Sequence, residues 1–216
     1  MSLAQPGSSG ALPWKRLPFL LYLVGFFTTW SSIRLALGEQ GHTWLAGVVK
    51  GLVWAVPVLL YLLLVERRAP LRYLRLATVP SRGDRQPWLY VALLLLNVVG
   101  FRLFWGRGLV VALGWEALLV LVLLTAITEE IVFRGFILQQ LVVRYAFPTA
   151  NLLTALLFVL IHVPIWFLTY QLDLAEVART APVTFAVSWI LGTLFAGTRS
   201  LWPPIAVHAV YNLLAA

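Results

Sequence analysis

The sequence contains no cysteine and very little charge, and both absences narrow the possible classes of protein. Without cysteine there can be no disulfide framework, no Cys-ligated zinc, no iron–sulfur cluster and no cysteine nucleophile. Charged residues make up 11% of the chain and hydrophobic residues 61%, whereas a soluble domain has about 25% charged residues. A soluble fold of 216 residues could not hide that much apolar surface from water. We therefore predict an integral, multi-pass membrane protein.

The apolar runs predict an all-α fold, a polytopic transmembrane helix bundle. A spanning helix needs about 20 apolar residues, so the chain has room for about seven spans. The predicted spans are residues 18–37, 44–65, 88–105, 115–143, 148–169, 182–196 and 203–216. The fourth is longer than a membrane requires, so we expect it to tilt or to protrude.

The chain divides into a tail and two groups of helices. Residues 1–13 are small, polar and rich in Pro and Gly, so we expect a disordered tail. Residues 14–114 would hold three N-terminal transmembrane helices, and residues 115–216 the remaining spans. The first apolar run lacks a convincing signal-peptide cleavage site, so it is expected to stay as the first span.

Half of the net charge of +8 comes from one predicted loop, residues 66–87, which also contains Glu66 and Asp84. Its six arginines are Arg67, Arg68, Arg72, Arg75, Arg82 and Arg85. Arginine-rich loops lie on the cytoplasmic side, where anionic lipid attracts them. We therefore predict a cytoplasmic loop 66–87, an outside C-terminus and a bacterial plasma membrane, with lipid and not nucleic acid as the partner of this charge. Residues 71–76 within the loop are either a short interfacial helix or a solvated segment.

A few other charged residues fall near the predicted span ends. Arg34, Lys50 and Arg102 are expected to extend along the helices and reach the membrane interface with their charged groups. Asp173 and Glu176 are expected in a solvated loop before the sixth span. His42 lies in another predicted loop and receives no role.

Ionisable residues inside spans are costly and often functional, and the first such cluster lies in the fourth span. Glu129 and Glu130 are adjacent there, so their side chains point about 100° apart on a helix. Glu130 and Arg134 are four residues apart on one face, which predicts an ion pair. Glu129 then has no partner in its own helix and is a natural proton acceptor and donor. The alternative is a polar network that only packs helices.

Two further clusters lie in the fifth and seventh spans. His162 follows Phe158 by four residues, so this ring could wall a pocket around the imidazole. His208 and Asn212 also share one helix face, where they could bind a metal ion weakly or donate to a developing oxyanion. Each pair alone is as consistent with helix packing as with function. Together with Glu129 they provide the groups needed to activate a water molecule.

The order of these motifs resembles a known family. Glu129-Glu130…Arg134, Phe158…His162 and His208…Asn212, on successive membrane helices, are similar to the motifs of the CAAX-protease and bacteriocin-processing family, also called the Abi family. The resemblance covers about residues 115–216. It implies a four-helix catalytic core that encloses a membrane cavity and hydrolyses a peptide bond of a peptide or membrane-protein substrate.

The resemblance also implies roles for the individual residues. Glu129 and His162 would activate the water, and His208 and Asn212 would stabilise the oxyanion. The supporting residues would be Glu130, Arg134 and Phe158. The family is often described as metalloproteases, although a metal-free glutamate mechanism has also been proposed. The implied cofactor is therefore either one divalent metal ion, with zinc the expected species and Glu129, His162 and His208 its candidate ligands, or none.

The resemblance is also compatible with other functions. Eukaryotic members of the family trim prenylated CAAX tails, and others process peptides, confer immunity to them or act as membrane scaffolds. A silent scaffold or bacteriocin-immunity protein is therefore the main alternative to an intramembrane endopeptidase. A small proton-coupled transporter is less consistent with the sequence, which has no matched repeat halves.

Overall fold

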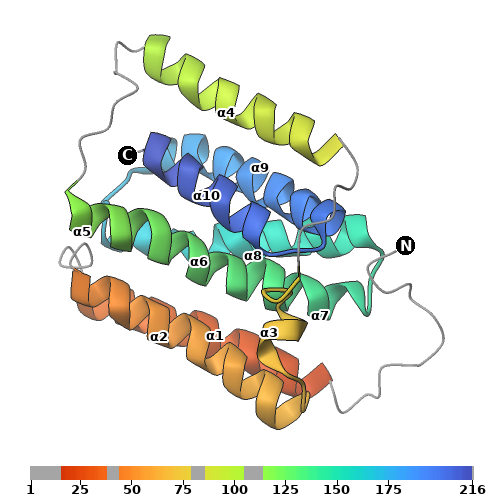
Figure 1. Ribbon diagram of the computed structural model, residues 1–216. Helices are drawn as coiled ribbons and strands as arrows, with labels where there is room; N and C mark the ends of the chain where they lie inside the picture. The colour runs from red at the N-terminus through yellow and green to blue at the C-terminus, as the bar shows by residue number, and fades with distance from the viewer. Residues whose placement is uncertain (1–15, 38–43, 79–85, 105–113, 216) are drawn as a thin grey trace.

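The computed structural model describes residues 16–37, 44–78, 86–104 and 114–215, which are almost entirely helical and contain no strand (Figure 1). The α-helices are α1 (Arg16–Leu37), α2 (Trp44–Leu60), α3 (Pro70–Tyr73), α4 (Gln86–Phe104), α5 (Trp115–Ala117), α6 (Thr125–Glu130), α7 (Gln139–Val142), α8 (Phe147–Leu168), α9 (Leu174–Thr198) and α10 (Trp202–Ala215). Three stretches with π-helical bonding continue these rods: η3 (Tyr61–Val65), η4 (Leu118–Leu124) and η5 (Ile131–Leu138). The all-α prediction is confirmed.

Four of these helices are long and apolar enough to cross a membrane by themselves. They are Leu17–Ala36, Gly47–Val65, Phe147–Leu168 and Leu174–Thr198. The segment Trp88–Phe104 is a shorter apolar helix. The chain is thus an integral membrane protein, as predicted, while the number of seven spans stays a prediction. The predicted tail, residues 1–13, and the loop histidine His42 lie outside the described residues.

The rod from α5 to α7 runs through the middle of the bundle. Figure 1 shows α1 and α2 on one side of it, α9 and α10 on the other, and α4 outermost. Contacts join α6 to both α2 and α10, and α8 to both α1 and α9. A residue in the middle of this rod can therefore meet side chains from several helices.

Aromatic side chains fill the core between α1, α2 and the central rod. The rings of Phe26 and Trp54 meet edge to face with centroids 5.0 Å apart, and those of Tyr22 and Phe136 at 4.9 Å. Lipid tails are as apolar as these rings, so such helices associate through close packing and hydrogen bonds rather than through hydrophobic burial. Edge-to-face packing of large rings supplies this contact.

The helix α9 begins earlier than the sequence analysis predicted. Its N-cap is Asp173, whose Oδ1 accepts from the backbone N–H of Glu176 at 2.8 Å, while the Glu176 side chain accepts from the N–H of Asp173 at 2.9 Å. Asp173 is exposed and lies just before the helix, as expected of a loop residue, whereas the expectation of a solvated loop was wrong for Glu176, which lies in the first turn of α9. This reciprocal capping box starts the helix eight residues before Pro182, which lies inside it.

The predicted interface locations of Arg34 and Arg102 were also wrong. Arg34 is 2% exposed and donates to the Thr169 hydroxyl, beyond the end of α8. Arg102 is buried as well and donates to the carbonyl oxygen of Leu214 at 2.7 Å. Both guanidinium groups find acceptors on a neighbouring segment of the bundle, so neither has to reach the lipid headgroups.

The segment after η3 folds back onto the end of the bundle. It forms the single turn α3 and then buries Leu74 completely. Gln139 donates to the carbonyl oxygen of Tyr73 at 2.7 Å, and the Trp202 indole donates to that of Leu76 at 2.9 Å. This part of the arginine-rich loop is thus a short helix fixed to α7 and α10.

A close approach of α8 and α9 makes one glycine indispensable. A Cβ at Gly192 would lie 1.8 Å from Oδ1 of Asn151. The Asn151 side chain is itself buried, and its Nδ2 donates to the Trp189 carbonyl at 3.0 Å. Gly192→Ala should therefore destabilise the protein by about 1–3 kcal/mol through overpacking. Gly25→Ala is the matched control, because a Cβ there meets nothing within 4 Å. Detergent-solubilised thermal unfolding checks the pair, and equal melting temperatures would contradict this packing.

Candidate active site

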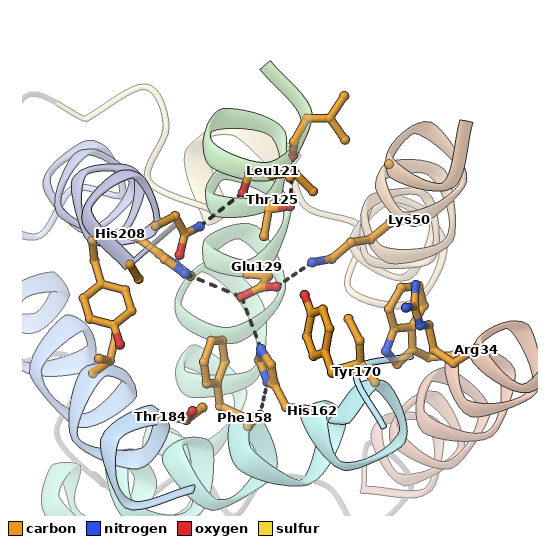
Figure 2. A pocket seen from close by; sticks show the side chains of 18 residues that line it. Arg34, Lys50, Leu121, Thr125, Glu129, Phe158, His162, Tyr170, Thr184 and His208 are labelled. Carbon is orange, nitrogen blue, oxygen red and sulfur yellow. Dashed lines mark hydrogen bonds and ion pairs between the residues drawn. The ribbon is translucent and has the colours of Figure 1, made fainter. Parts of the chain in front are cut away.

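A cavity of about 480 Å³ lies between α1, α2, the central rod, α8, α9 and α10. Its lining includes four residues that the sequence analysis proposed as catalytic: Glu129, His162, His208 and Asn212. Phe158 also lines it. Three separate helical rods supply these side chains, and Figure 2 shows the first three directed toward one another. The structure thus brings the predicted residues together in one place.

Glu129 lies at the centre of this group. Its Oε1 is 2.5 Å from Nζ of Lys50, which comes from α2. Its Oε2 faces Nε2 of His208 at 3.6 Å and Nε2 of His162 at 4.0 Å. One carboxylate oxygen is therefore held by a cation, and the other is directed toward both imidazoles (Figure 2).

The hydrogen bonds of the two histidines define their tautomers. Nδ1 of His162 is 2.6 Å from the carbonyl oxygen of Phe158, which can only accept, so Nδ1 carries the proton. Nδ1 of His208 is 2.7 Å from Oε1 of Glu130, and the same argument applies to this carboxylate. In the neutral imidazoles both Nε2 atoms are then proton acceptors that face Glu129. Oε2 of Glu129 and the two Nε2 atoms are consequently three hydrogen-bond acceptors around one small part of the cavity.

Glu130 belongs to a second network directly behind the first. Arg134 donates to its Oε1 at 2.7 Å, and both side chains are 0% exposed. Arg134 also donates to the carbonyl and hydroxyl oxygens of Ser188 on α9, each at 2.9 Å. The predicted ion pair within one helix is present, and it also fixes α9 and orients His208 through their shared carboxylate.

Asn212 and Phe158 complete the wall around the histidines. Nδ2 of Asn212 is 3.5 Å from the carbonyl oxygen of Leu121, at the outer limit of a hydrogen bond. The amide is therefore only weakly engaged and can donate to another acceptor. The ring of Phe158 packs against His162, with centroids 4.6 Å apart, and lies under the Arg134 guanidinium at 4.9 Å.

The sequence analysis missed Lys50 and Arg34 as residues of this site. Both line the cavity, and Lys50 is 15% exposed, with its ammonium 4.7 Å above the Trp54 ring. Both had been assigned to the membrane interface, and Glu129 had been left without a partner. Two signals were available: Lys50 lies six residues inside its helix, and a buried carboxylate needs a counter-charge.

Irregular helix geometry surrounds the two glutamates. The stretch α6, which ends at Glu130, lies between η4 and η5, where the bonding is π-helical. Such segments inside α-helices are frequent at functional sites. Here they rotate and displace the side chains on either side of Glu129 relative to a continuous α-helix, a feature that spacing rules cannot predict.

The predicted metal ligands have suitable donor atoms but not the arrangement of a metal site. Among the described residues, no group of three or more His, Asp or Glu side chains is placed to hold an ion. In addition, Oε1 of Glu129 already contacts the Lys50 ammonium. The zinc prediction therefore stays a prediction.

Comparison with known proteins finds a family model that matches the C-terminal part of the chain. Residues 111–214 match a family model described as type II CAAX prenyl endopeptidase Rce1-like. No curated protein and no solved structure matches the chain. The matched segment contains all the motif residues from Glu129 to Asn212.

Removal of Arg134 should destabilise the protein far more than neutralisation of Glu129. Arg134→Ala would leave Glu130 as a buried carboxylate without its guanidinium partner, which costs about 3–5 kcal/mol. Glu129→Gln keeps the volume, and its amide oxygen can still accept from Lys50, whose ammonium borders the cavity and is partly exposed. Thermal unfolding of the two purified variants in detergent checks this, and similar melting temperatures would show that the Glu130–Arg134 pair does not support the fold.

Proposed function

We propose that this chain, whose residues 111–214 belong to the Rce1-like branch of the CAAX-protease family, is an intramembrane endopeptidase that uses Glu129 to activate water. The observation that carries the proposal is the environment of Glu129. One of its oxygens is held by Lys50, and the other faces two imidazole acceptors inside a cavity. A carboxylate so placed can accept a proton from water.

The proposed reaction begins with a water molecule between Glu129 and His162. Oε2 of Glu129 and Nε2 of His162 accept its hydrogens, which directs an oxygen lone pair toward the substrate carbonyl carbon. As the new C–O bond forms, Glu129 takes one proton and the carbonyl π electrons move to oxygen. Glu129 then gives that proton to the amide nitrogen, the C–N bond breaks, and an acid and an amine result.

The oxyanion needs hydrogen-bond donors, and Asn212 is the first candidate because its amide is weakly engaged. His208 can donate from Nε2 only as an imidazolium. Glu130 at Nδ1 and Glu129 near Nε2 are the negative charges that would stabilise this form. We therefore assign oxyanion stabilisation to Asn212 and, in its charged form, His208.

Lys50 acts in this proposal as a positioning residue. Its ammonium holds Oε1 of Glu129 and is itself confined by the rings of Trp54 at 4.7 Å and Trp30 at 5.9 Å. With Oε1 engaged, Oε2 remains directed at the histidines. A displacement of a catalytic group by about 1 Å can lower a rate by roughly 100-fold.

A metal-dependent version uses the same residues differently. Glu129, His162 and His208 would have to move from the positions described above to hold the ion, which would supply Lewis-acid activation of water. Hydrolysis that survives prolonged treatment with a chelator supports the glutamate mechanism. Loss of activity that zinc alone restores would support the metal-dependent one.

A scaffold or immunity protein without catalysis is the second possibility. It would need the Glu130–Arg134–Ser188 network for stability, but it has no use for a carboxylate directed at two imidazoles within a cavity. The matched family also favours the peptidase. We therefore retain the scaffold only as the outcome that an inactive protein would indicate.

Glu129→Gln should abolish peptide hydrolysis while leaving the fold intact. The amide has nearly the same volume but cannot take a proton, and a general base contributes about 10²–10⁴-fold to a rate. The measurement is product formation from a peptide library by the reconstituted protein, with thermal unfolding of each variant beside it. Wild-type turnover by a folded Glu129→Gln variant would refute the assignment.

Lys50→Met should lower kcat by at least about tenfold and change KM little, because a displaced Glu129 affects the chemical step more than substrate binding. Lys50→Arg keeps the charge and should restore part of the loss. The Lys50→Met, Glu129→Gln double variant should be no slower than Glu129→Gln alone. If Lys50→Met slowed the Glu129→Gln variant by the same factor as it slows the wild type, the two effects would be independent, and Lys50 would not act through Glu129.

A further inference from the structure

The cavity extends from the middle of the bundle to one particular end. Glu129 lies 14 residues into the rod that starts at Trp115, so it is about 20 Å along that helix. Other lining residues are close to helix termini: Gly47 near the start of α2, Tyr170 just after α8 and Ala215 at the end of α10. All of these termini belong to the end of the bundle at which α5 begins. The cavity therefore reaches this end, which we call the cavity end.

The opposite end of the bundle carries most of the positive charge. It contains α3, the end of α7 and the turn between α9 and α10 (Figure 1). Among the described residues, one acidic residue, Glu66, accompanies the arginines of this basic end, which are Arg67, Arg68, Arg72, Arg75, Arg144, Arg199 and Arg16 at the start of α1. Arg67, Arg68 and Arg72 are exposed.

The cavity end has the reverse charge balance at its surface. Glu116, Asp173 and Glu176 are exposed or half-buried there, against Arg179 among the described residues. The other cations at this end, Arg34, Lys50 and Arg102, have side chains that contact the protein interior. Because contacts inside the protein hold these three side chains, their charges do not indicate which side of the membrane this end occupies.

The side of the membrane follows from this asymmetry. Cytoplasmic segments next to membrane helices carry an excess of Lys and Arg, and anionic lipid of the inner leaflet attracts them. This rule places the basic end in the cytoplasm. The cavity end then faces the other side of the membrane.

We infer that the cavity admits its substrate from the non-cytoplasmic side and that this substrate is an apolar peptide segment. The identity of the substrate rests on the proposed function, whereas the side of access does not. The cavity wall is largely aromatic and aliphatic, with Trp30, Phe158, Ile165, Tyr170, Val187 and Tyr211 among its residues. Such a wall suits apolar side chains. The chain would thus act on exported or outward-facing peptides and not on cytoplasmic tails.

Single cysteines can test the side of access directly, because the chain has no native thiol. Thr184→Cys places a thiol in the cavity lining, Ala178→Cys on an exposed site at the cavity end, and Ala77→Cys on an exposed site at the basic end. A membrane-impermeant maleimide added to intact bacterial cells should label Thr184→Cys and Ala178→Cys. It should label Ala77→Cys only after permeabilisation or in inside-out vesicles.

Several results would overturn the inference. Labelling of Ala77→Cys with protection of Ala178→Cys in intact cells would reverse the orientation. Labelling of Thr184→Cys only from the cytoplasmic side, or from neither side, would show that the cavity does not open outward. These outcomes do not depend on hydrolysis, so an inactive protein would refute the proposed function without affecting this test.

A second arm addresses the substrate. The protein is reconstituted into oriented proteoliposomes whose cavity end faces outward. A quenched-fluorescent apolar peptide is then added outside, either free in solution or on a lipid anchor. In a parallel sample the same peptide is enclosed in the lumen. Cleavage should occur only with external peptide. The form that is cleaved distinguishes a soluble source from a membrane-bound one, and cleavage of lumenal peptide alone would contradict outward access.

Discussion

Two adjacent carboxylates in the middle of a membrane protein must each be compensated, and much of this structure follows from that constraint. Glu130 is neutralised within its own rod by Arg134, whose Nη2 donates to Ser188 on α9. Glu129 points elsewhere and meets Lys50 from α2. The two pairs join the N-terminal helices, the central rod and α9, because an uncompensated charge in low dielectric would be far more costly than these contacts.

The Glu130–Arg134 and Glu129–Lys50 ion pairs have different consequences for function. Arg134 and Glu130 are completely buried, so their pair can serve as a rigid support, and Glu130 also fixes the tautomer of His208. Lys50 and Glu129 border a cavity, and Lys50 contacts only one oxygen of the carboxylate. This leaves Oε2 available for proton transfer. A single Glu-Glu pair thus provides a supporting residue and a candidate catalytic residue.

The sequence could predict what depends on neighbours along one helix. Spacing by four residues predicted the Glu130–Arg134 pair and put His208 and Asn212 on one face, and apolar runs predicted most of the helices. The partners of Lys50 and Arg34 on other segments were missed, because they depend on tertiary packing that spacing does not encode. The early start of α9 was a different error: the Asp173–Glu176 capping box was readable in the sequence, but Pro182 was taken as the helix start. The π-helical stretches around Glu129 left no signal in the sequence.

The central claim is that Glu129 activates water and does not itself attack the substrate. Peptide cleavage by the reconstituted protein in ¹⁸O-labelled water, with hydroxylamine present, separates these two reactions by mass spectrometry of the products. Direct attack by water predicts a new C-terminal carboxylate that carries ¹⁸O and no hydroxamate. A hydroxamate product would reveal an acyl-enzyme intermediate, and it would contradict the role assigned here to Glu129.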